Sequence, residues 1–469
     1  MPPSPEDPLK ATSAFLRFES ENNLYSLRTV SGKYYWSVLR HEVIRVIFGI
    51  GRRQKPRKFK KTKLLPKIAR FGRMLLRWGC IFLFPPAKYR YVMYTNSRTR
   101  NDEGEQYDLY QDHIWERIRE QCLWIESHDN KGAFPYKYGR PLLYPILILH
   151  PLLTDALVNR LVKEDFRELR SLLRQHYPEY NISLTFLRRY YLWYRLDYLF
   201  YSFLFKRLPR LKGIFFIRNN TQTGLIEAAR KHGITIVEAQ HGIPYKNAIP
   251  SPHFPTVYPE GAIPKLDYLL SFSSYAQKCN EYPTFNTLTL GNDILARKKD
   301  IPTEVRNRFR TLMVVPQLSD SALLEELSIT FAEENPEWAL IFKVKPSNFD
   351  QLEHCQKRFA EQENIRVVGG ERDMMTLLDE VHAVLLTHST TFYEAMHRQV
   401  KCLVYQRSNY MMFKDNFDLP NVYLVDNVKE VEVALQQPLV DAPELHGLFY
   451  QPFDPAALEQ VLREIDEKK

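Results

Sequence analysis

The sequence predicts an α/β protein with two doubly wound, Rossmann-like domains, preceded by a basic helical extension. The chain has 469 residues, which suits two domains or slightly more. It is 44% hydrophobic and 26% charged, a composition that lets each domain bury a core. From Gly213 onward, short apolar runs alternate with helical patterns, which is typical of parallel sheets. We place the extension at 1–85, the first domain at 86–293 and the second at 294–469.

The extension is marked by its charge. The formal net charge of the chain is +10, and the stretch from Val43 to Asn101 contains no Asp or Glu. A run of cations inside it is followed directly by an apolar, aromatic group, the composition of an interfacial lipid-binding element. We therefore expect 45–85 to meet an anionic membrane surface, with a solvated basic loop and a core helix as the alternative. The cations are Arg52, Arg53, Lys55, Arg57, Lys58, Lys60, Lys61, Lys63 and Lys67, and the apolar group is Met74, Leu75, Leu76, Trp78, Ile81, Phe82 and Phe84.

The first domain is predicted to open on a buried strand, continue through a helix-rich middle and end in regular alternation. The helix expected at Leu187–Lys206 is crowded with aromatic and Arg side chains, so it packs on a sheet with its Arg stems turned outward or stacks on bases or sugars. The expected strands are Tyr89–Thr95, Gly213–Ile217, Ile234–Val237 and Asp267–Phe272, with a helix at Thr221–His232.

The second domain alternates throughout, after a charged linker at Leu290–Phe309. The expected strands are Thr311–Val315, Ala339–Val344, Ile365–Val368, Ala383–Thr387, Cys402–Tyr405 and Val422–Val425; the helices are Ser321–Glu334, Phe349–Glu361, Asp373–Asp379, Thr391–His397 and Val428–Leu435. Sheets of this kind bind ligands at the carboxyl ends of their strands, where the strand order reverses.

Cysteine usage and the absence of targeting signals indicate a cytoplasmic protein. The five cysteines are far apart and include no C-x-x-C, so neither disulfides nor a zinc site is indicated, and we expect no metal. The N-terminus lacks a signal-peptide pattern, and no apolar run reaches the roughly 20 residues of a spanning helix.

The first candidate site follows the strand that ends at Val237. Gly242 lets the backbone turn sharply, which presents His241 on a tight loop. An imidazole titrates near neutrality, so His241 can take the proton of an attacking hydroxyl. Glu238 is a second candidate base, or the carboxylate that orients His241; a loop that simply satisfies both side chains is the structural alternative.

The second candidate site follows the strand that ends at Thr387. Hydroxyls stand where a helix begins, an arrangement that suits a phosphate, and Glu394 lies one turn into that helix, where a carboxylate can accept from ribose hydroxyls. A plain helix cap is the alternative. The candidate donor-binding residues here are His388, Ser389, Thr390, Thr391 and Glu394.

Two further segments end strands of the second domain. Lys343 and Lys345 precede a proline that stops a strand, where two cations suit a phosphate; two exposed rim lysines are the alternative. Ser319 lies in the segment that follows the first strand of this domain and is a further candidate phosphate contact, while Asp320 is expected to act as a cap.

These elements, in this order, resemble bacterial surface-polysaccharide transferases of the two-domain GT-B type, a group that includes sialyltransferases, Kdo transferases of capsule synthesis and CDP-glycerol glycerophosphotransferases. Gln240-His241-Gly242 looks like their His-Gly segment, which holds the acceptor base, and Tyr258–Gly261 is similar to the segment that trails it in capsule enzymes. Thr387–Thr391 looks like their Ser/Thr motif for the donor phosphate. Glu394-Ala395-Met396 is similar to a sugar-transferase segment whose Glu binds ribose.

One position departs from that pattern. The group usually has Lys-x-His-Pro where this chain has Lys343-Val344-Lys345-Pro346. Lys345 replaces the charge of that histidine but not its proton chemistry at neutral pH. The departure weakens the case for a CMP-linked donor and leaves room for other nucleotide-sugars.

The resemblance implies a metal-independent glycosyltransferase that uses a nucleotide-sugar as co-substrate, with no other cofactor. Its acceptor would be a hydroxyl of a surface polysaccharide or of a lipid-linked precursor, reached at the inner face of the plasma membrane. Two alternatives stay open: a CDP-glycerol type polyol-phosphate transferase, and a non-catalytic scaffold of a polysaccharide assembly complex. Nucleic-acid binding is not expected, because the basic run carries no RNA- or DNA-binding motif.

Overall fold

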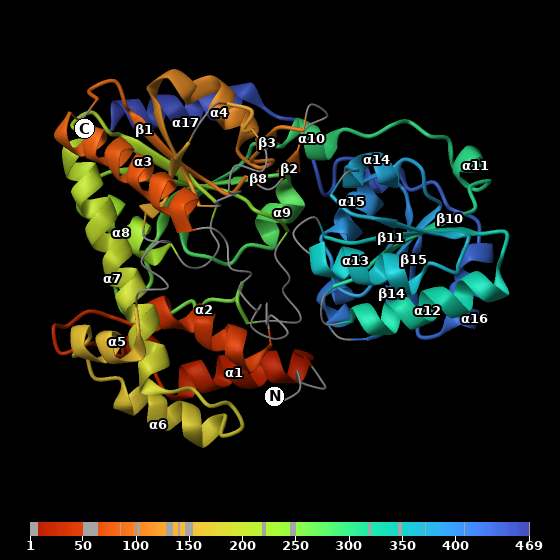
Figure 1. Ribbon diagram of the computed structural model, residues 1–469, viewed down its shortest axis with the longest axis horizontal. Helices are drawn as coiled ribbons and strands as arrows, with labels where there is room; N and C mark the ends of the chain where they lie inside the picture. The colour runs from red at the N-terminus through yellow and green to blue at the C-terminus, as the bar shows by residue number, and fades with distance from the viewer. Residues whose placement is uncertain are drawn as a thin grey trace.

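The computed structural model describes residues 8–49, 64–84, 86–97, 99–100, 104–127, 135–138, 141–145, 153–217, 222–243, 250–317, 320–345, 349–370, 372–407 and 409–468. Within these ranges the predicted fold class is confirmed: two Rossmann-like α/β domains, each built on a parallel sheet, with helices at the N-terminus. In Figure 1 the first sheet and its helices lie on the left and the second on the right.

Every strand pair of the first sheet is parallel. Starting from β1, the chain adds strands first on one side and then on the other, so the strand order reverses between β1 and β6. Side chains of these inner strands are buried because helices cover both faces. Across the sheet, the described strands run β5 (Leu142–Leu143), β4 (Cys122–Glu126), β1 (Tyr91–Thr95), β6 (Gly213–Phe216), β7 (Thr235–Ala239), β8 (Leu266–Ser271) and β9 (Thr284–Thr289).

The second sheet repeats this plan, and all six of its predicted strands are present. Its order reverses between β10 and β13, which are neighbours. Across the sheet, the described strands run β12 (Ile365–Val368), β11 (Ala339–Lys343), β10 (Thr311–Val315), β13 (Ala383–Leu386), β14 (Lys401–Tyr405) and β15 (Val422–Val425). The helices of this domain are α12 (Ser321–Glu334), α13 (Phe349–Arg358), α14 (Met374–Leu378), α15 (Thr391–His397) and α16 (Val428–Gln436).

The N-terminal helices form a unit of their own with residues far along the chain. A cluster of buried side chains joins α1 (Pro8–Glu21) and α2 (Trp36–Ile47) to α5 (Asp155–Leu161), α6 (Arg167–His176) and the first half of α7 (Leu184–Arg207). At its centre Arg40 and Glu19, both buried, form an ion pair at 2.6 Å. A buried pair of this kind is stable only with good geometry, and Arg40 also donates to the carbonyl of Pro250 at 2.9 Å.

The segment predicted as one extension, 1–85, therefore divides into two structural parts. The first helices belong to the unit just described, whereas α3 (Leu64–Leu83) packs against the first sheet through Met74 and Trp78. Most of the basic run lies outside the described residues. Within the described residues, no helix has both the length and the apolar character needed to cross a bilayer.

The long helix α7 connects the helical unit to the first domain. Its second half packs on the sheet together with α8 (Thr223–Lys231). The two helices approach closely at Gly224, where a Cβ atom would lie 2.6 Å from Cβ of Asp197 and 2.7 Å from the carbonyl oxygen of Tyr194. Only glycine fits this crossing. The remaining described elements of this domain are α4 (Asp112–Ile118), α9 (Ser274–Lys278) and the hairpin of β2 (Thr99–Arg100) and β3 (Gln106–Tyr107).

Two segments cross between the domains side by side. The first leads from β9 into α10 (Asp293–Ala296) and α11 (Thr303–Arg306); the second leads back into α17 (Pro455–Glu467). Leu458, Val461 and Ile465 of α17 pack on the first sheet, so the last helix of the segment predicted as the second domain, 294–469, packs with the first domain instead. The sequence does not predict this return to the first domain, because an amphipathic helix can pack on either sheet.

Gly291 in the first crossing is expected to tolerate no side chain. Its φ is +70°, and a Cβ atom would lie 1.9 Å from the carbonyl oxygen of Pro452 in the second crossing. Gly291→Ala should therefore lower the free energy of unfolding by more than about 3 kcal/mol, measured by urea denaturation. Gly447→Ala is the matched control: its φ is also +70°, but its nearest neighbour is Cγ of Gln451 at 3.9 Å, so it should lose only about 1 kcal/mol. Equal losses in both variants would contradict the close crossing.

Candidate functional site

The residues predicted after β10 and β13 meet at the switch point of the second sheet. Because β10 and β13 are parallel neighbours whose connections leave in opposite directions, the loops at their carboxyl ends diverge and leave space between them. Gln317 and Asp320 follow β10, and Thr387 and His388 follow β13. Ser319, also predicted here, lies outside the described residues.

Asp320 stands at the N-cap position of α12 but does not form the expected side-chain cap; its carboxylate organises this point instead. Its carboxylate is buried, accepts from the backbone N–H of Gln317 at 2.8 Å, and accepts the hydroxyl hydrogen of Thr387. It lies 3.5 Å from Nδ1 of His388. Burial raises the pKa of Asp320 above its ordinary value, although these donors and the charge of Lys345 act the other way. The carboxylate thus ties the ends of both strands together.

His388 is held as a neutral imidazole. Its Nδ1 lies 3.0 Å from Oγ1 of Thr387. Burial, with a smaller contribution from the nearby charge of Lys345, lowers the pKa of His388 to about 4. At neutral pH the ring therefore takes part in hydrogen bonds without carrying charge.

The two predicted lysines have different environments. Lys345 is exposed and donates to the side-chain carbonyl of Gln317, so its ammonium lies at the switch point. Lys343 is buried, and its ammonium donates to the carbonyls of Gly369 and Arg372, the latter at 3.0 Å. Lys343 thus holds the loop that leads into α14, and Lys345 is the cation better placed to meet a ligand.

The hydroxyl residues lie where α15 begins. Ser389 Oγ accepts from the backbone N–H of Thr391 at 3.3 Å and lies 3.1 Å from Oγ1 of Thr391. Thr390 is partly exposed, while Ser389 and Thr391 are buried. Thr390, at the N-cap position, does not form the side-chain cap that was the alternative interpretation of this segment. The structure therefore brings the predicted hydroxyls, His388 and Lys345 to one edge of the sheet.

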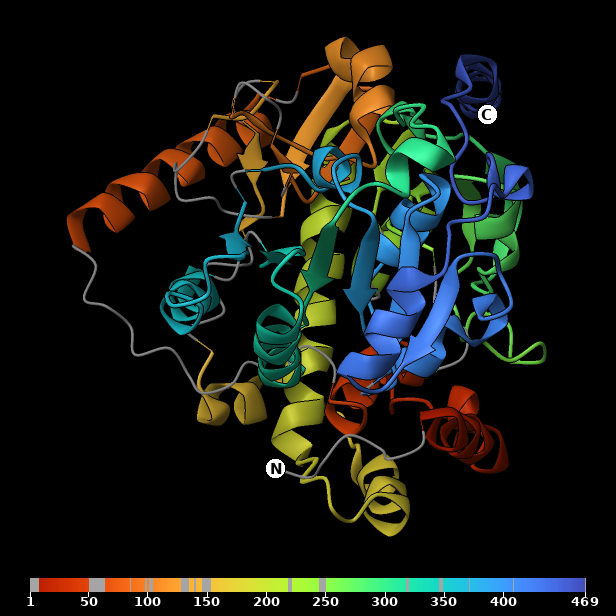
Figure 2. The same cartoon turned by 90° about the vertical axis from the view of Figure 1, so that its right-hand side faces the viewer.

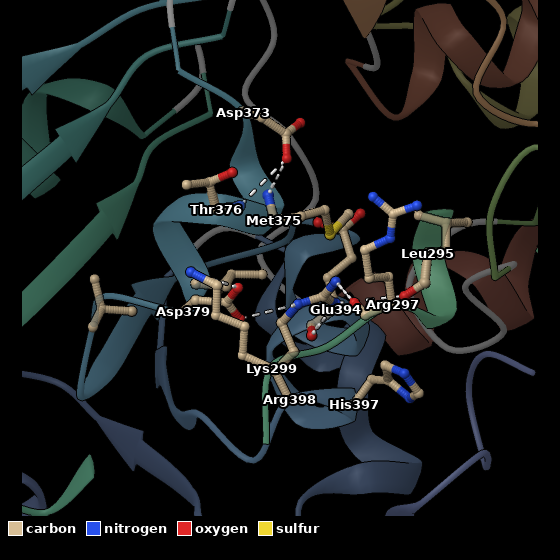
Figure 3. A network of polar contacts seen from close by, with 12 residues as sticks. Leu295, Arg297, Lys299, Asp373, Met375, Thr376, Asp379, Glu394, His397 and Arg398 are labelled. Carbon is tan, nitrogen blue, oxygen red and sulfur yellow. Dashed lines mark hydrogen bonds and ion pairs between the residues drawn. The ribbon is translucent and has the colours of Figure 1, made fainter. Parts of the chain in front are cut away.

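Glu394 sits in the next turn of α15, within a polar network shown in Figure 3. Burial raises its pKa to about 7, which Arg398 opposes and the carboxylate of Asp373 reinforces. Arg398, itself buried, donates to the carbonyls of Glu394 at 3.4 Å and of Arg297, and forms an ion pair with Asp379 at 3.8 Å. This guanidinium fixes α15 to the connector that leaves α10.

His241 approaches this edge from the first domain. Its side chain is exposed, and its ring lies 4.8 Å from the ring of Tyr110. A Cβ atom on the adjoining Gly242 would lie 3.6 Å from Cγ2 of Thr390. The carboxyl edges of the two sheets therefore meet where the two predicted sites lie. Glu238 is buried within β7, between β6 and β8, three residues before His241.

Gln240 anchors the His241 loop. Its side-chain amide donates to the carbonyl of Ala276 at 3.1 Å and accepts from the backbone N–H of Phe272 at 3.3 Å. Its own backbone N–H continues the pairing with β8 by donating to Leu270 at 2.9 Å. His241 thus follows directly on Gln240, whose hydrogen bonds fix the end of β7.

No sequence pattern identified the residues that support His241. Asp108, which is buried, accepts from the backbone N–H of Tyr110 at 3.0 Å and of Asn96 at 2.8 Å, so it positions Tyr110 against the His241 ring. Burial raises the pKa of Asp108 to about 6. Glu126, fully buried at the end of β4, accepts from the Thr95 hydroxyl at 2.9 Å. A single Asp in a polar loop is too common a pattern to single out.

Comparison with known proteins gives distant likenesses only. No family model and no curated protein sequence matches the chain. Among solved structures, it is similar to Staphylococcus aureus MnaA with UDP, at 12% identity, TM-score 0.45, 80% of this chain and 96% of that one. It is similar to Methanocaldococcus jannaschii UDP-GlcNAc 2-epimerase with UDP-GlcNAc and UDP (11%, 0.44, 80% and 99%) and to Acinetobacter baumannii MurG (11%, 0.43, 81% and 99%). We base the functional proposal on the geometry of this chain.

In the described part of the chain, no three His, Cys, Asp or Glu side chains gather as ligands for a metal ion. At the contact of the two domains the exposed His241 imidazole adjoins the hydroxyls of α15, with Lys345 at the switch point of the second sheet and Glu394 one turn further along α15. This set can accept a proton, bind an anion and hydrogen-bond to a polyol.

Glu394 makes a prediction for the pH dependence of stability. Because its folded-state pKa is about 7 and its ordinary value is 4.5, the folded protein binds this proton more tightly, and stability is lost as pH rises from about 4.5 through 7. Glu394→Gln should remove that loss: thermal unfolding at pH 8 should show a gain of up to about 3 kcal/mol over the wild type, and none at pH 4. Glu326→Gln, with 70% of its side chain exposed, is the control for lost charge. A gain of equal size at both pH values would refute the assignment.

Proposed function

We propose that the protein is a metal-independent glycosyltransferase that moves a sugar from a nucleotide-sugar to a hydroxyl of a surface polysaccharide or of its lipid-linked precursor. One observation carries the proposal: the His241 loop of the first domain meets the head of α15 in the second, with 3.6 Å between the Cβ position of Gly242 and Cγ2 of Thr390. A candidate base and a candidate donor site therefore adjoin.

The chemistry follows from the groups on each side. His241 takes the proton of the acceptor hydroxyl as its oxygen bonds to the anomeric carbon. The bond from that carbon to the donor phosphate breaks, and the nucleotide leaves with the bonding electrons. Lys345, with hydrogen bonds from Ser389 and Thr390, balances the developing negative charge. The Glu394 carboxyl, whose pKa burial raises to about 7, hydrogen-bonds to the ribose hydroxyls, and His388 contributes a neutral hydrogen-bonding edge.

The support residues fit this division of labour. Tyr110 packs on the His241 ring and is itself fixed by Asp108, while Gln240 fixes the strand end before it. Arg398 holds α15 and the connector together, so that Glu394 and the hydroxyls keep their places relative to the first domain. We further propose that the protein works at the cytoplasmic face of the plasma membrane, where a lipid-linked acceptor is presented.

A nucleotide screen tests the donor side. A ligand that binds only the folded state raises the melting temperature, so we expect one of CMP, CDP, UDP or GDP, or its sugar conjugate, to raise it in a thermal-shift assay. Glu394→Ala and Ser389→Ala should weaken this shift strongly. Leu323→Ser, at an exposed position on α12, should keep it. A response to CMP and CDP-glycerol alone would favour the polyol-phosphate alternative, and no response to any nucleotide would favour the scaffold.

His241 separates binding from catalysis. His241→Ala should lower the transfer rate about 10²- to 10⁴-fold, the usual contribution of a general base. The nucleotide-induced thermal shift should be unchanged, because His241 contacts the acceptor. Transfer is measured as release of free nucleotide in the presence of acceptor glycan. A variant that keeps the wild-type rate would exclude His241 as the base.

A further inference from the structure

We propose that the second half of α7, together with the carboxyl-terminal end of α3, forms a face that binds an anionic lipid bilayer. The face consists of the apolar side chains Leu76, Leu83, Phe84, Leu199 and Phe203 with the cations Lys206 and Arg207. It deepens the membrane location proposed above and does not depend on the transferase chemistry. In Figure 1 both helices run along the left of the molecule, on the side away from the second sheet.

The apolar side chains of this face are far more exposed than packing requires. Leu83 and Phe84 are 74% and 77% exposed, and Leu76 is 70% exposed. On α7, Leu199 and Phe203 are 57% and 45% exposed. Leu76 and Leu83 are seven residues apart, and Leu199 and Phe203 four apart, so each pair lies on one side of its helix. Grouped exposed apolar side chains mark an interaction surface.

The two helices make one continuous surface. The ring of Phe82 lies 4.8 Å from the ring of Phe203, and Trp78 lies 5.0 Å from Phe200. Trp78 also donates to the carbonyl of Leu143 at 2.9 Å, which fixes this part of α3 on the sheet. The exposed Leu83 and Phe84 directly follow Phe82, the residue through which α3 contacts Phe203. Figure 2 shows α3 extending outward from the rest of the molecule.

Charge identifies the occupant. Neither α3 nor the exposed part of α7 offers a carboxylate: α3 has no Asp or Glu, and the one acid of α7, Asp197, is bound by the Tyr144 hydroxyl with a pKa raised by burial. Lys206 and Arg207 are exposed beside the apolar stripe, and the Arg207 guanidinium lies 5.4 Å from the Phe203 ring.

In the described parts of α3 and α7, cations and no exposed carboxylates border the apolar side chains. This matches a bilayer with anionic headgroups, in which Phe and Leu enter the acyl boundary while Lys and Arg reach the phosphates. A protein partner of mixed charge would find no exposed carboxylate on these two helices for its own cations. From the sequence, α7 was expected either to pack on the sheet or to stack on bases or sugars. Its second half packs on the sheet with one side and exposes Leu199 and Phe203 on the other.

The test is co-sedimentation of the full chain with vesicles of phosphatidylcholine, with and without phosphatidylglycerol. Wild type should bind the anionic vesicles, less so at high salt, and the pure phosphatidylcholine vesicles weakly. The double variants Leu83→Ser/Phe84→Ser and Lys206→Glu/Arg207→Glu should each weaken binding about tenfold or more. Leu323→Ser/Val433→Ser, at positions 49% and 58% exposed on the second domain, is the matched control and should bind as wild type.

Cys80 provides a second readout. It is the one exposed cysteine of the five, so an environment-sensitive fluorophore reacts there without further substitution. Its emission should shift to the blue on anionic vesicles. Binding unchanged in both double variants would overturn the proposal, as would dimerisation lost in Leu83→Ser/Phe84→Ser with no vesicle binding by wild type. The nucleotide-induced thermal shift of these variants reports on the donor site separately, so failure of one proposal is distinguishable from failure of the other.

Discussion

Between the two sheets the chain crosses twice, and the crossings are bonded to each other. The N–H of Asn292 donates to the carbonyl of Gln451 at 2.8 Å, and the N–H of Asp454 donates to that of Leu290 at 2.7 Å. Gly291 packs directly on the backbone of Pro452. Since a single flexible linker would leave the domains free to rotate, this paired crossing is what brings the carboxyl edges of the two sheets to each other. The contact between Gly242 and Thr390, and with it the candidate site, depends on it.

The sequence predicted the second domain well because its strands are short, apolar and separated by clear helical patterns. Residues such as Leu386 and Val404 are fully buried between helices and leave no ambiguity. The first domain was harder. Cys122–Glu126 was missed as a strand because it is short and directly follows a charged helical segment, and β9 was missed because its polar, alternating residues lie at an edge. The segment that forms α17 was included in the second domain, since its apolar residues carry no information about which sheet they pack on.

The site shows the same limits. Position after a strand correctly predicted which residues reach the carboxyl edges, because that follows from parallel topology alone. It did not distinguish Lys343 from Lys345, which are two residues apart. Lys343 is the last residue of β11 and its ammonium reaches carbonyls inside the domain, whereas Lys345 lies beyond the strand end and is exposed. Nor did it find Tyr110 or Arg398, which act through contacts between segments more than a hundred residues apart.

The charges of the proposed donor site limit which of its groups can stabilise a leaving phosphate. Burial keeps His388 neutral and favours the uncharged, protonated form of Glu394. Near neutral pH, the positive charge exposed at this edge is therefore that of Lys345. Lys343 and Arg398 are engaged by backbone carbonyls. One exposed ammonium does not offset two phosphate charges, so hydroxyl and backbone N–H donors at Ser389 and Thr390 must carry much of the stabilisation. Because a nucleotide's own charge disfavours ionisation of a nearby carboxyl, binding should also raise the pKa of Glu394, unless the ribose hydroxyls donate to it strongly enough to compensate.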